Sequence, residues 1–439
     1  MQNYISTEEL YQRFLNASQL VCIDTRQLQK GSLFFALKGA NFNAGEFAQA
    51  AIDAGCNLSV VEEERFVTHE RIVLVENVLT ALQQLANHHR KQFKIPVLAI
   101  TGSNGKTTHK ELINAVMSKK FKTLATFGNL NNHIGVPLTL LNLRSEHEFA
   151  IIEMGANHVG EIDALCTITE PDFGLVTNIG KAHLEGFGGI EGVKKGKSEL
   201  YKFLKRHQGK SFINGDDEVL YELAFENDKI SYGCKKLYDV IGKNESSAET
   251  VSFKYTTRYG EKDWNKLSVI QTQIVGAYNF INCLAAVCVG THFKVDEALI
   301  QEALENYLPS MNRSQLVKTK KNVILLDAYN ANPQSMKAAI ENFAHYRSAH
   351  KLVLLGDMFE LGEYSREEHQ KLIDLLKHNK FEEVLLVGSE FFNLQDNGFK
   401  KFKTTEECKT YLQESDVSGT TILIKGSRGM KMEQLQEVL

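Results

Sequence analysis

The chain has 439 residues, of which 43 % are hydrophobic and 24 % are charged. This length predicts two or three domains that each bury a core of their own, and the composition excludes a disordered chain. The 54 acidic and 50 basic residues give a formal net charge of −4, which disfavours nucleic-acid binding because such proteins normally carry a basic surplus.

The sequence offers no segment that would place it in or across a membrane. Its longest apolar run, Cys283 to Val289, is far shorter than the roughly 18 residues that a membrane span needs. The first ten residues have neither a basic start nor an apolar stretch, so no signal peptide is expected. The seven cysteines include no CxxC pair, which favours reduced thiols in a cytoplasmic protein over a disulfide framework or a zinc site.

Residues 1–94 are expected to form a small N-terminal α/β domain. Short strands are predicted over 33–37, 58–62 and 72–75, and a helix over 78–92. A further helix is predicted to begin near residue 43, because Asn43 and Glu46 have the spacing of a capping box and apolar residues follow at helical spacing.

Two larger α/β domains are expected to follow, over 95–308 and 309–439. In the first, strand-like runs over 97–100, 150–154 and 174–179 alternate with helices, which favours a parallel, doubly wound sheet. Residues 237–274 alternate more like antiparallel strands, and a helix is predicted over 278–290. In the second, strands over 322–326, 351–355, 383–387 and 421–424 alternate with helices, which is typical of a Rossmann-like doubly wound domain.

The central domain opens with a glycine-rich turn, AITGSNGKTTHKE (99–111). It departs from the phosphate-loop pattern GxxxxGK[ST], because Ile100 stands at the first glycine position. Gly102 and Gly105 remain between a strand and a helix, where glycines let backbone N–H groups approach phosphate oxygens. We predict that Lys106 reaches the terminal phosphates and that the Thr107 hydroxyl binds Mg²⁺; a solvated lysine on an idle turn is the weaker alternative.

Further candidate residues follow the next central strands. Glu153 ends the strand at 150–154, at the sheet edge where a second Mg²⁺ ligand belongs, although a solvated strand end fits the pattern equally well. His183 follows the next strand and could be a ligand or a bystander. Lys194, Lys195 and Lys197 have the pattern of a charged helix face, and composition alone leaves them there.

Several long segments resemble one known family. TGSNGKTT, EMGANHVGEI, TNIGKAHLEGFG, GAYNFIN and DAYNANPQSM, in this order and spacing, are similar to the Mur ligases of peptidoglycan synthesis. GNLNNHIGVPLTLL (128–141) and KGSRGMKME (425–433) resemble the members that join D-alanyl-D-alanine to UDP-N-acetylmuramoyl-tripeptide. The resemblance covers nearly the whole chain, including residues 24–47. His109 departs from the threonine usual at its position, and no loss of activity is expected from it.

The resemblance implies an ATP-dependent, ADP-forming ligase in the cytoplasm, acting as a monomer with ATP and two Mg²⁺ ions. It implies that Lys106 contacts the β- and γ-phosphates, that Thr107 and Glu153 hold one Mg²⁺, and that His183 helps to hold a second. By position, Lys197 matches a family lysine that often carries a carbamate, which is an anionic metal ligand made from a neutral amine. The nucleotide-binding residues implied in this way are Gly102, Ser103, Asn104, Gly105, Lys106, Thr107, Thr108, Asn279, Asn282, Arg313 and Asp327.

The resemblance also implies where the two other substrates bind, and simpler interpretations stay open for several of these residues. The UDP-sugar is expected at Thr25, Arg26, Lys38, Asn41 and Asn43, each of which could equally be an exposed polar loop residue. The peptide or the sugar is expected at Asn129, Asn131 and Asn132, and the loop with Tyr329, Asn330 and Asn332 continues the site. The dipeptide is expected at Asp357, Glu360, Ser427 and Arg428. Asn279 could instead cap its own helix.

Two other functions remain open on the sequence alone. The first is another Mur-type or folylpolyglutamate-type amino-acid ligase; folylpolyglutamate synthetases share the phosphate loop but lack GNLNNHIGVPLTLL and YNANPQSM. The second is a nucleotide-dependent switch without ligation, which would explain the phosphate loop but not the separate third domain that carries Arg313 and Asp327.

Overall fold

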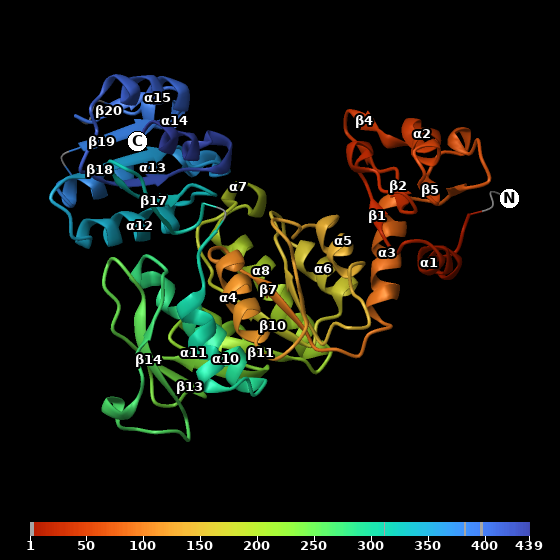
Figure 1. The fold of residues 1–439 in the computed structure, drawn as a ribbon, viewed down its shortest axis with the longest axis horizontal. Helices are drawn as coiled ribbons and strands as arrows, with labels where there is room; N and C mark the ends of the chain where they lie inside the picture. The colour runs from red at the N-terminus through yellow and green to blue at the C-terminus, as the bar shows by residue number, and fades with distance from the viewer. Residues whose placement is uncertain (1–3, 311, 382, 396–397) are drawn as a thin grey trace.

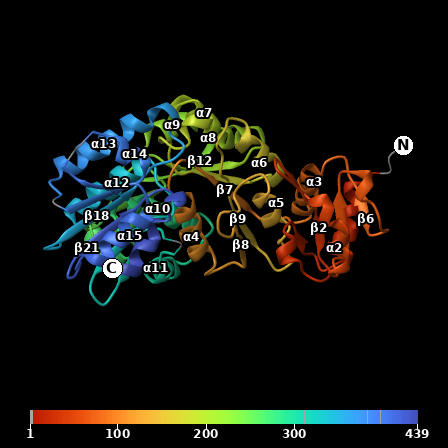
Figure 2. The same cartoon turned by 90° about the horizontal axis from the view of Figure 1, so that it is seen from above.

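The computed structural model describes residues 4–310, 312–381, 383–395 and 398–439. It contains three main β-sheets, each with its own helices, arranged along the longest axis of the molecule (Figure 1). The N-terminal unit lies at one end of this axis and the C-terminal unit at the other, with the central unit between them, as the second view also shows (Figure 2). The chain is therefore an α/β protein of three units, as predicted from the sequence.

The N-terminal unit is a four-stranded parallel sheet in the order β1-β2-β5-β6, with a short β3-β4 hairpin beside it. The strands are β1 (Val21–Cys22), β2 (Leu33–Phe35), β3 (Lys38–Gly39), β4 (Phe42–Asn43), β5 (Leu58–Val61) and β6 (Ile72–Leu74), and the helices are α1 (Thr7–Asn16), α2 (Ala48–Asp53) and α3 (Val78–Arg90). Helix α3 also packs on α5 and α6 of the central unit, so it joins the two units.

The helix predicted to begin near residue 43 begins later, and the predicted capping box is wrong. Residues Ala44–Phe47 form a 3₁₀ turn, and α2 begins at Ala48. The Asn43 side chain accepts from the N–H of Gly45 at 3.0 Å and donates to Glu63 at 2.7 Å, so it closes a short turn. Gly45 lies so close to the ring of Phe66 that an added Cβ would stand 2.5 Å from it, which fixes the turn against its neighbour.

The central unit is a nine-stranded sheet in the order β15-β14-β13-β12-β11-β10-β7-β9-β8. It is parallel from β8 to β13, and antiparallel where β13 pairs with β14 and β14 with β15. Its strands are β7 (Val97–Thr101), β8 (Thr123–Ala125), β9 (Phe149–Glu153), β10 (Phe173–Val176), β11 (Lys210–Asn214), β12 (Asp228–Gly233), β13 (Val240–Asn244), β14 (Ser252–Thr257) and β15 (Ile270–Gln271). Its helices are α4 (Lys106–Met117), α5 (Gly135–Leu140), α6 (Glu161–Thr169), α7 (Leu184–Phe187), α8 (Ile190–Arg206), α9 (Glu218–Leu223), α10 (Phe280–His292) and α11 (Glu297–Asn306).

Helices cover both faces of the central sheet. Every residue of β7 is buried, as expected for a strand in the middle of a parallel sheet that is covered on both sides. The apolar helix α10 and its neighbours α4 and α11 share one buried cluster with the sheet, while α6 and α8 belong to a second cluster. The core therefore fixes the carboxyl ends of β7, β9 and β10 next to one another.

The C-terminal unit is a six-stranded sheet in the order β16-β17-β21-β18-β19-β20, parallel except for the edge strand β16. Its strands are β16 (Gln315–Lys318), β17 (Val323–Asp327), β18 (Lys351–Gly356), β19 (Glu383–Val387), β20 (Lys400–Phe402) and β21 (Thr421–Lys425), and its helices are α12 (Pro333–His345), α13 (Ser365–His378), α14 (Ser389–Asn393) and α15 (Thr405–Glu414). Short 3₁₀ turns complete the chain at Thr25–Gln27, Glu64–Phe66, Trp264–Lys266, Ala277–Asn279, Gly362–Tyr364, Arg428–Met430 and Met432–Val438. In the part of the chain that the structure describes, no helix has the length and apolar character needed to cross a bilayer.

Candidate active site between the central and C-terminal units

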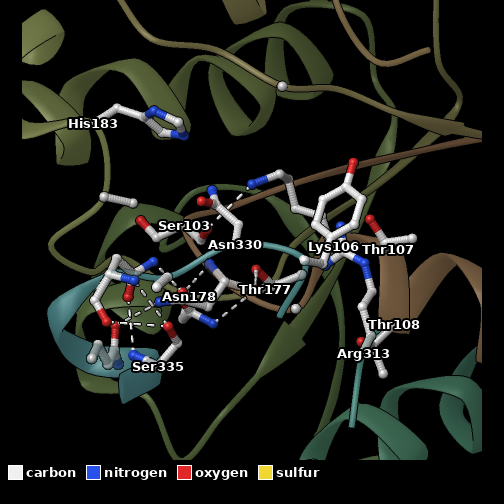
Figure 3. Close-up of a pocket in the computed structure, with 18 of the residues that line it drawn as sticks. Ser103, Lys106, Thr107, Thr108, Thr177, Asn178, His183, Arg313, Asn330 and Ser335 are labelled. Atoms are coloured by element: carbon white, nitrogen blue, oxygen red, sulfur yellow. Dashed lines mark hydrogen bonds between the residues drawn. The ribbon is translucent and has the colours of Figure 1, made fainter. Parts of the chain in front are cut away.

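A cavity of about 810 Å³ lies between the central and C-terminal units. Most of the residues predicted from the sequence for nucleotide and metal binding line it, together with some of the residues predicted to bind the peptide or the dipeptide. Those from the central unit are Ser103, Asn104, Gly105, Lys106, Thr107, Thr108, Asn129, Asn131, Asn132, Glu153, His183, Asn279 and Asn282, and those from the C-terminal unit are Arg313, Asp327, Tyr329, Asn330, Asn332, Glu360, Ser427 and Arg428. Figure 3 shows side chains of both units turned toward this space.

The glycine-rich turn joins β7 to α4 and is closed against the end of β10. Gly102 has φ +138°, and a Cβ there would stand 2.0 Å from the Thr177 hydroxyl, so only glycine fits. Ser103 donates its N–H to Asn178 and its hydroxyl to Gly180, both at 3.0 Å, and the Thr177 hydroxyl donates to the carbonyl of Asn104 at 2.6 Å. The turn is therefore fixed by backbone and side-chain hydrogen bonds, and it presents the N-terminus of α4 to the cavity.

Lys106 lies at the first position of α4. Its ammonium donates to the carbonyls of Gly102 at 2.8 Å and Ser103 at 3.2 Å, so the side chain folds back over the turn. Burial lowers the pKa of Lys106, an effect that the nearby Glu153 carboxylate opposes. Lys106 therefore places an amine beside the N-terminus of α4, at the wall of the cavity.

Glu153 ends β9 and is 1 % exposed. Its Oε1 accepts from the Thr107 hydroxyl at 3.2 Å and from the Asn131 amide at 2.8 Å, while its Oε2 has no hydrogen-bond partner. A buried carboxylate oxygen without a partner, next to a hydroxyl, is a donor set that suits a hard cation such as Mg²⁺. Within the described residues, three or more His, Cys, Asp or Glu side chains do not gather at any one point that could hold a metal ion.

His183 follows β10 and lines the cavity (Figure 3). It has φ +53°, and its Nδ1 stands 2.5 Å from Oε2 of Glu360, which itself has φ +62°. The imidazole of His183 beside it is the largest cause that lowers the pKa of Glu360. Two residues in the left-handed region thus meet across the boundary between the units.

Lys197, which the resemblance singles out among three nearby lysines, differs from the other two in its burial. Lys197 is 1 % exposed, whereas Lys195 is exposed and Lys194 half-buried. Its ammonium donates to the carbonyl of Ala156 at 3.0 Å and stands 5.0 Å from the centre of the Phe187 ring. Burial, with the charge of Lys106, lowers the pKa of Lys197 well below its ordinary value, which favours the neutral amine that carbamate formation requires.

The amide pair at the start of α10 lies at the cavity and does not cap the helix. Asn279 occupies the N-cap position but makes no capping hydrogen bond, so the capping alternative is wrong. Its amide donates to Val275 at 2.8 Å and accepts from Asn282 at 2.7 Å. The two side chains are held against each other, with Asn282 also facing the turn at Gly105.

Side chains of the C-terminal unit close the opposite wall. The guanidinium of Arg313 lies 3.6 Å from the centre of the Tyr329 ring, and its Nε has no partner. Asp327 ends β17 and pairs with Lys425 at 2.5 Å. The Tyr329 hydroxyl accepts from Arg428 at 3.5 Å, so this wall is a connected layer of charged and aromatic groups.

Asn332 makes structural contacts that its sequence motif did not indicate. It caps α12 in a capping box with Ser335, and its amide donates to Asn104 in the glycine-rich turn at 2.5 Å. Asn104 in turn donates to Gln334 at 3.0 Å. The start of α12 is therefore hydrogen-bonded directly to the turn of the central unit.

Eight predicted residues do not line the cavity. Two of them stand directly behind it: Gly102 lies within the glycine-rich turn, and Lys197 donates to the carbonyl of the lining residue Ala156. Asp357 accepts from the N–H groups of Glu390 at 2.8 Å and Phe391 at 3.0 Å, so its carboxylate holds the start of α14 and does not line the cavity. The others belong to the N-terminal unit and are Thr25, Arg26, Lys38, Asn41 and Asn43. Arg26 pairs with Asp24 at 2.6 Å and Lys38 with Glu63 at 3.4 Å, both near the surface.

The cavity also contains polar residues that sequence reasoning missed, among them Asn178, Tyr278, Gln334 and Lys425. Lys425 could have been found, because it ends a predicted parallel strand at the edge where ligands bind. Asn178 also follows such a strand. Tyr278 and Gln334 offered no comparable signal, since only the packing of the two units brings them to the cavity.

Comparisons with known proteins agree with this geometry. Residues 100–290 match the model of the Mur ligase middle domain, and residues 312–428 match that of the Mur ligase, glutamate ligase domain. The UDP-N-acetylmuramoyl-tripeptide–D-alanyl-D-alanine ligase of Bacillus subtilis is 34 % identical, over 94 % of this chain and 92 % of the relative.

Two crystal structures have the same arrangement. MurF from Acinetobacter baumannii matches with a TM-score of 0.85 and 32 % identity, over 95 % of this chain and 92 % of that one. MurF ligase from Thermotoga maritima in complex with ADP matches with a TM-score of 0.84 and 26 % identity, over 95 % and 96 %. The extent of these matches, from the first unit to the last, shows that the chain belongs to the Mur ligase family.

Proposed function

We propose that this protein is an ATP-dependent ligase that joins D-alanyl-D-alanine to UDP-N-acetylmuramoyl-tripeptide in the synthesis of peptidoglycan precursors. The observation that carries the proposal is the cavity itself, where a phosphate-binding turn faces charged residues of a second unit. The name of the Bacillus subtilis relative supports this choice of substrates, and the ADP-bound Thermotoga maritima structure supports ATP as the nucleotide.

The reaction must make a carboxylate reactive toward an amine. A carboxylate oxygen of the tripeptide attacks the γ-phosphorus of ATP, the bond from this phosphorus to the β–γ bridging oxygen breaks, and ADP leaves. The neutral amine of D-alanyl-D-alanine then attacks the acyl carbon, and the tetrahedral intermediate loses phosphate and a proton to give the amide. The protein contributes positioning and the neutralisation of charge.

In this proposal the central wall carries the phosphate chemistry. The ammonium of Lys106 leaves the carbonyls of Gly102 and Ser103 and binds the β- and γ-phosphates. Thr107 and Glu153 would hold one Mg²⁺ and His183 would help to hold a second, and the metal would supply positive charge toward the transferring phosphoryl group. Lys197 would contribute an anionic metal ligand if it carried a carbamate, and burial, which lowers the pKa of its amine, favours the neutral form that carbamate formation needs.

The C-terminal wall completes the site when the two units are together. Arg313 and Asp327 bind the nucleotide from this side, while Asn279 and Asn282 present amide groups to the purine. Arg428 is the candidate for the free carboxylate of the dipeptide, since a guanidinium binds carboxylates with two parallel hydrogen bonds. Ser427 and Glu360 lie beside it at the cavity, and Asp357 is left out because its carboxylate caps α14.

We propose a matching division of labour along the chain. Residues 1–94 bind the UDP-sugar, with Arg26 and Lys38 as the cations nearest to the diphosphate. Residues 95–308 bind ATP and, through Asn129, Asn131 and Asn132, the peptide. Residues 309–439 bind the dipeptide. We further infer a monomer that works in the cytoplasm, where its nucleotide substrates are made.

The test is a panel of substrate pairs, and its readouts are phosphate release and mass spectrometry of the product. The purified enzyme receives ATP and Mg²⁺ with a UDP-linked dipeptide, a UDP-linked tripeptide or a folate, each combined with D-alanyl-D-alanine, D-alanine or glutamate. Phosphate release should require both the tripeptide and D-alanyl-D-alanine, and the product mass should equal their sum less one water. Glutamylation of folate, or ATP hydrolysis that needs neither substrate, would refute the proposal.

A further inference from the structure

Lys110 is a buried lysine outside the cavity that the proposed mechanism does not use. It lies on α4, one turn beyond Lys106, and its side chain is 1 % exposed. A buried charge is unfavourable unless it is paired and hydrogen-bonded, so the contacts of this ammonium indicate what it does.

The ammonium of Lys110 joins three segments of the central unit. It donates to the backbone carbonyl of Thr126 at 2.6 Å, where the chain leaves β8. It pairs with Glu111 on its own helix at 2.9 Å, and it stands 4.0 Å from Oε2 of Glu153, the carboxylate oxygen without a hydrogen-bond partner.

Thr126 continues these contacts toward the end of β9. Its hydroxyl accepts from the backbone N–H of Glu153 at 2.9 Å, so Lys110 and Glu153 are connected through one residue as well as directly. The loop 126–134 then returns to the same strand end, where Asn131 donates to Glu153 at 2.8 Å and accepts from the N–H of Gly155 at 2.7 Å. This loop also carries Asn129 and Asn132 to the cavity.

We propose that Lys110 is a positioning residue that holds Glu153 and the loop 126–134 in one fixed arrangement with the helix of the phosphate-binding turn. Lys110 thereby keeps the Glu153 carboxylate and the asparagines of the loop 126–134 in a constant position relative to each other. The inference rests on the proposed function for the identity of the acceptor and for Glu153 as a metal ligand, whereas the arrangement of Lys110, Thr126 and Glu153 does not depend on it.

A purely structural role for Lys110 predicts a different result. Were it only an internal ion pair, its replacement would change the free energy of unfolding and leave ligand binding by the folded protein unchanged. Were it chiefly a charge that competes with a cation for Glu153, its removal would strengthen Mg²⁺ binding. A positioning role predicts weaker Mg²⁺ binding, because the carboxylate loses its support.

The first experiment measures binding and needs no turnover. Binding of a non-hydrolysable ATP analogue is followed by calorimetry across a series of Mg²⁺ concentrations, for the full chain and for Lys110→Met, which keeps the length and removes the charge. We expect the Mg²⁺ concentration for half-maximal binding to rise roughly 10- to 100-fold, as for other residues that support metal ligands. An unchanged or lowered Mg²⁺ requirement in the folded variant would overturn the proposal.

Two further variants separate the contacts. Glu111→Gln removes the outer partner of Lys110 and leaves the contacts with Thr126 and Glu153, so it should need the same Mg²⁺ concentration as the unmodified protein. Thr126→Val removes the hydroxyl that accepts from Glu153 and keeps the carbonyl that accepts from Lys110. It should raise the Mg²⁺ requirement in the same direction as Lys110→Met, and it decides the question if Lys110→Met does not fold; no rise would overturn the proposal.

Hydrogen exchange provides an independent readout on the loop. In the ligand-free protein, amides of 126–134 should exchange faster in Lys110→Met than in Glu111→Gln, and slow exchange in both would contradict the role assigned to Lys110. If the unmodified protein fails to ligate D-alanyl-D-alanine, the proposed function fails, but these comparisons of exchange and Mg²⁺ requirement still test the positioning role.

Discussion

The two walls of the cavity are built in different ways. The central wall consists of the carboxyl ends of β7, β9 and β10, which are held together by one parallel sheet and by the buried clusters on its two faces. The C-terminal wall meets it through side-chain contacts, such as Asn332 with Asn104 and Lys181 with Glu368, the latter at 2.6 Å. The first wall therefore belongs to one continuous sheet, whereas the second is joined to it only by side chains, through polar contacts and a shared buried cluster that includes Val275 and Ala331.

This difference predicts how each wall contributes to catalysis. Polar contacts and ion pairs near a surface each contribute little, and interfaces of this kind between units permit relative motion. The central wall should therefore exist before any substrate binds, and the approach of the C-terminal wall should complete the site. Substitutions in the central wall should lower kcat, and substitutions at the contact between the walls should chiefly raise KM.

The largest effect is expected from Lys106→Ala on the central wall. It removes the cation that, in the proposed mechanism, stabilises charge on the transferring phosphoryl group, so kcat should fall by roughly 10³-fold or more. The circular dichroism spectrum should stay unchanged, because the side chain belongs to no apolar cluster. The exposed Lys195→Ala is the matched control and should keep full turnover. Product formation at the normal rate by Lys106→Ala would show that the turn does not bind the reacting phosphates.

Lys197→Ala should lose almost as much ligation activity, and small carboxylates should restore part of it. The variant lacks the amine that would carry a carbamate, so ligation should be nearly absent under ordinary assay conditions. Added acetate or formate should restore part of the rate by supplying a carboxylate in the vacated space, while Lys195→Ala should not respond to either. A fully active Lys197→Ala would exclude the carbamate.

A substitution at the contact between the walls should have a smaller effect, and it should change KM more than kcat. Gln334→Ala removes the hydrogen bond that α12 accepts from Asn104, worth about 1 kcal/mol, so KM for ATP should rise about fivefold with little change in kcat. Lys337→Ala, on the exposed side of the same helix, is the control and should leave both constants unchanged. If Gln334→Ala instead lowered kcat alone, the distinction between the two walls would be wrong.

The same difference explains which features the sequence predicted well. Buried parallel strands such as β7 and β9 are continuous apolar runs that end at polar residues, so both the strand and the place of Lys106 or Glu153 at the sheet edge follow from local pattern. The edge strands β16 and β20 could not be predicted in this way, because each is short and at least half-exposed.

Contacts between distant segments could not be predicted in this way. Nothing near Asn332 indicates that its amide reaches Asn104, and nothing near Asp357 indicates that its carboxylate caps α14 instead of facing the cavity. Lys197 illustrates the same limit. Lys194 and Lys195 are the same residue type in the same segment, and only the packing of α8 shows that Lys197 is the buried one of the three.

The smallest catalytic effect is expected at His109, where a pH-dependent change in stability should appear instead. His109 is buried on α4, its Nδ1 bonds to the carbonyl of Gly105 at 2.9 Å and its Nε2 has no partner. Burial lowers its pKa from 6.5 to about 4. Between these values the unfolded chain binds a proton that the folded protein does not, so stability from this residue is present above about pH 6.5 and is lost as the pH falls toward 4.

His109→Thr should remove this dependence and keep ligation close to normal. Relative to its own stability at pH 8, the variant should lose about 2 kcal/mol less than the unmodified protein at pH 5. Urea unfolding of both proteins at the two pH values measures the difference, and the comparison within each protein cancels the cost of the smaller side chain. Equal losses in the two proteins would mean that His109 already takes up its proton in the folded state, and that the central wall beneath the turn is less tightly closed than the packing of α4 against the sheet indicates.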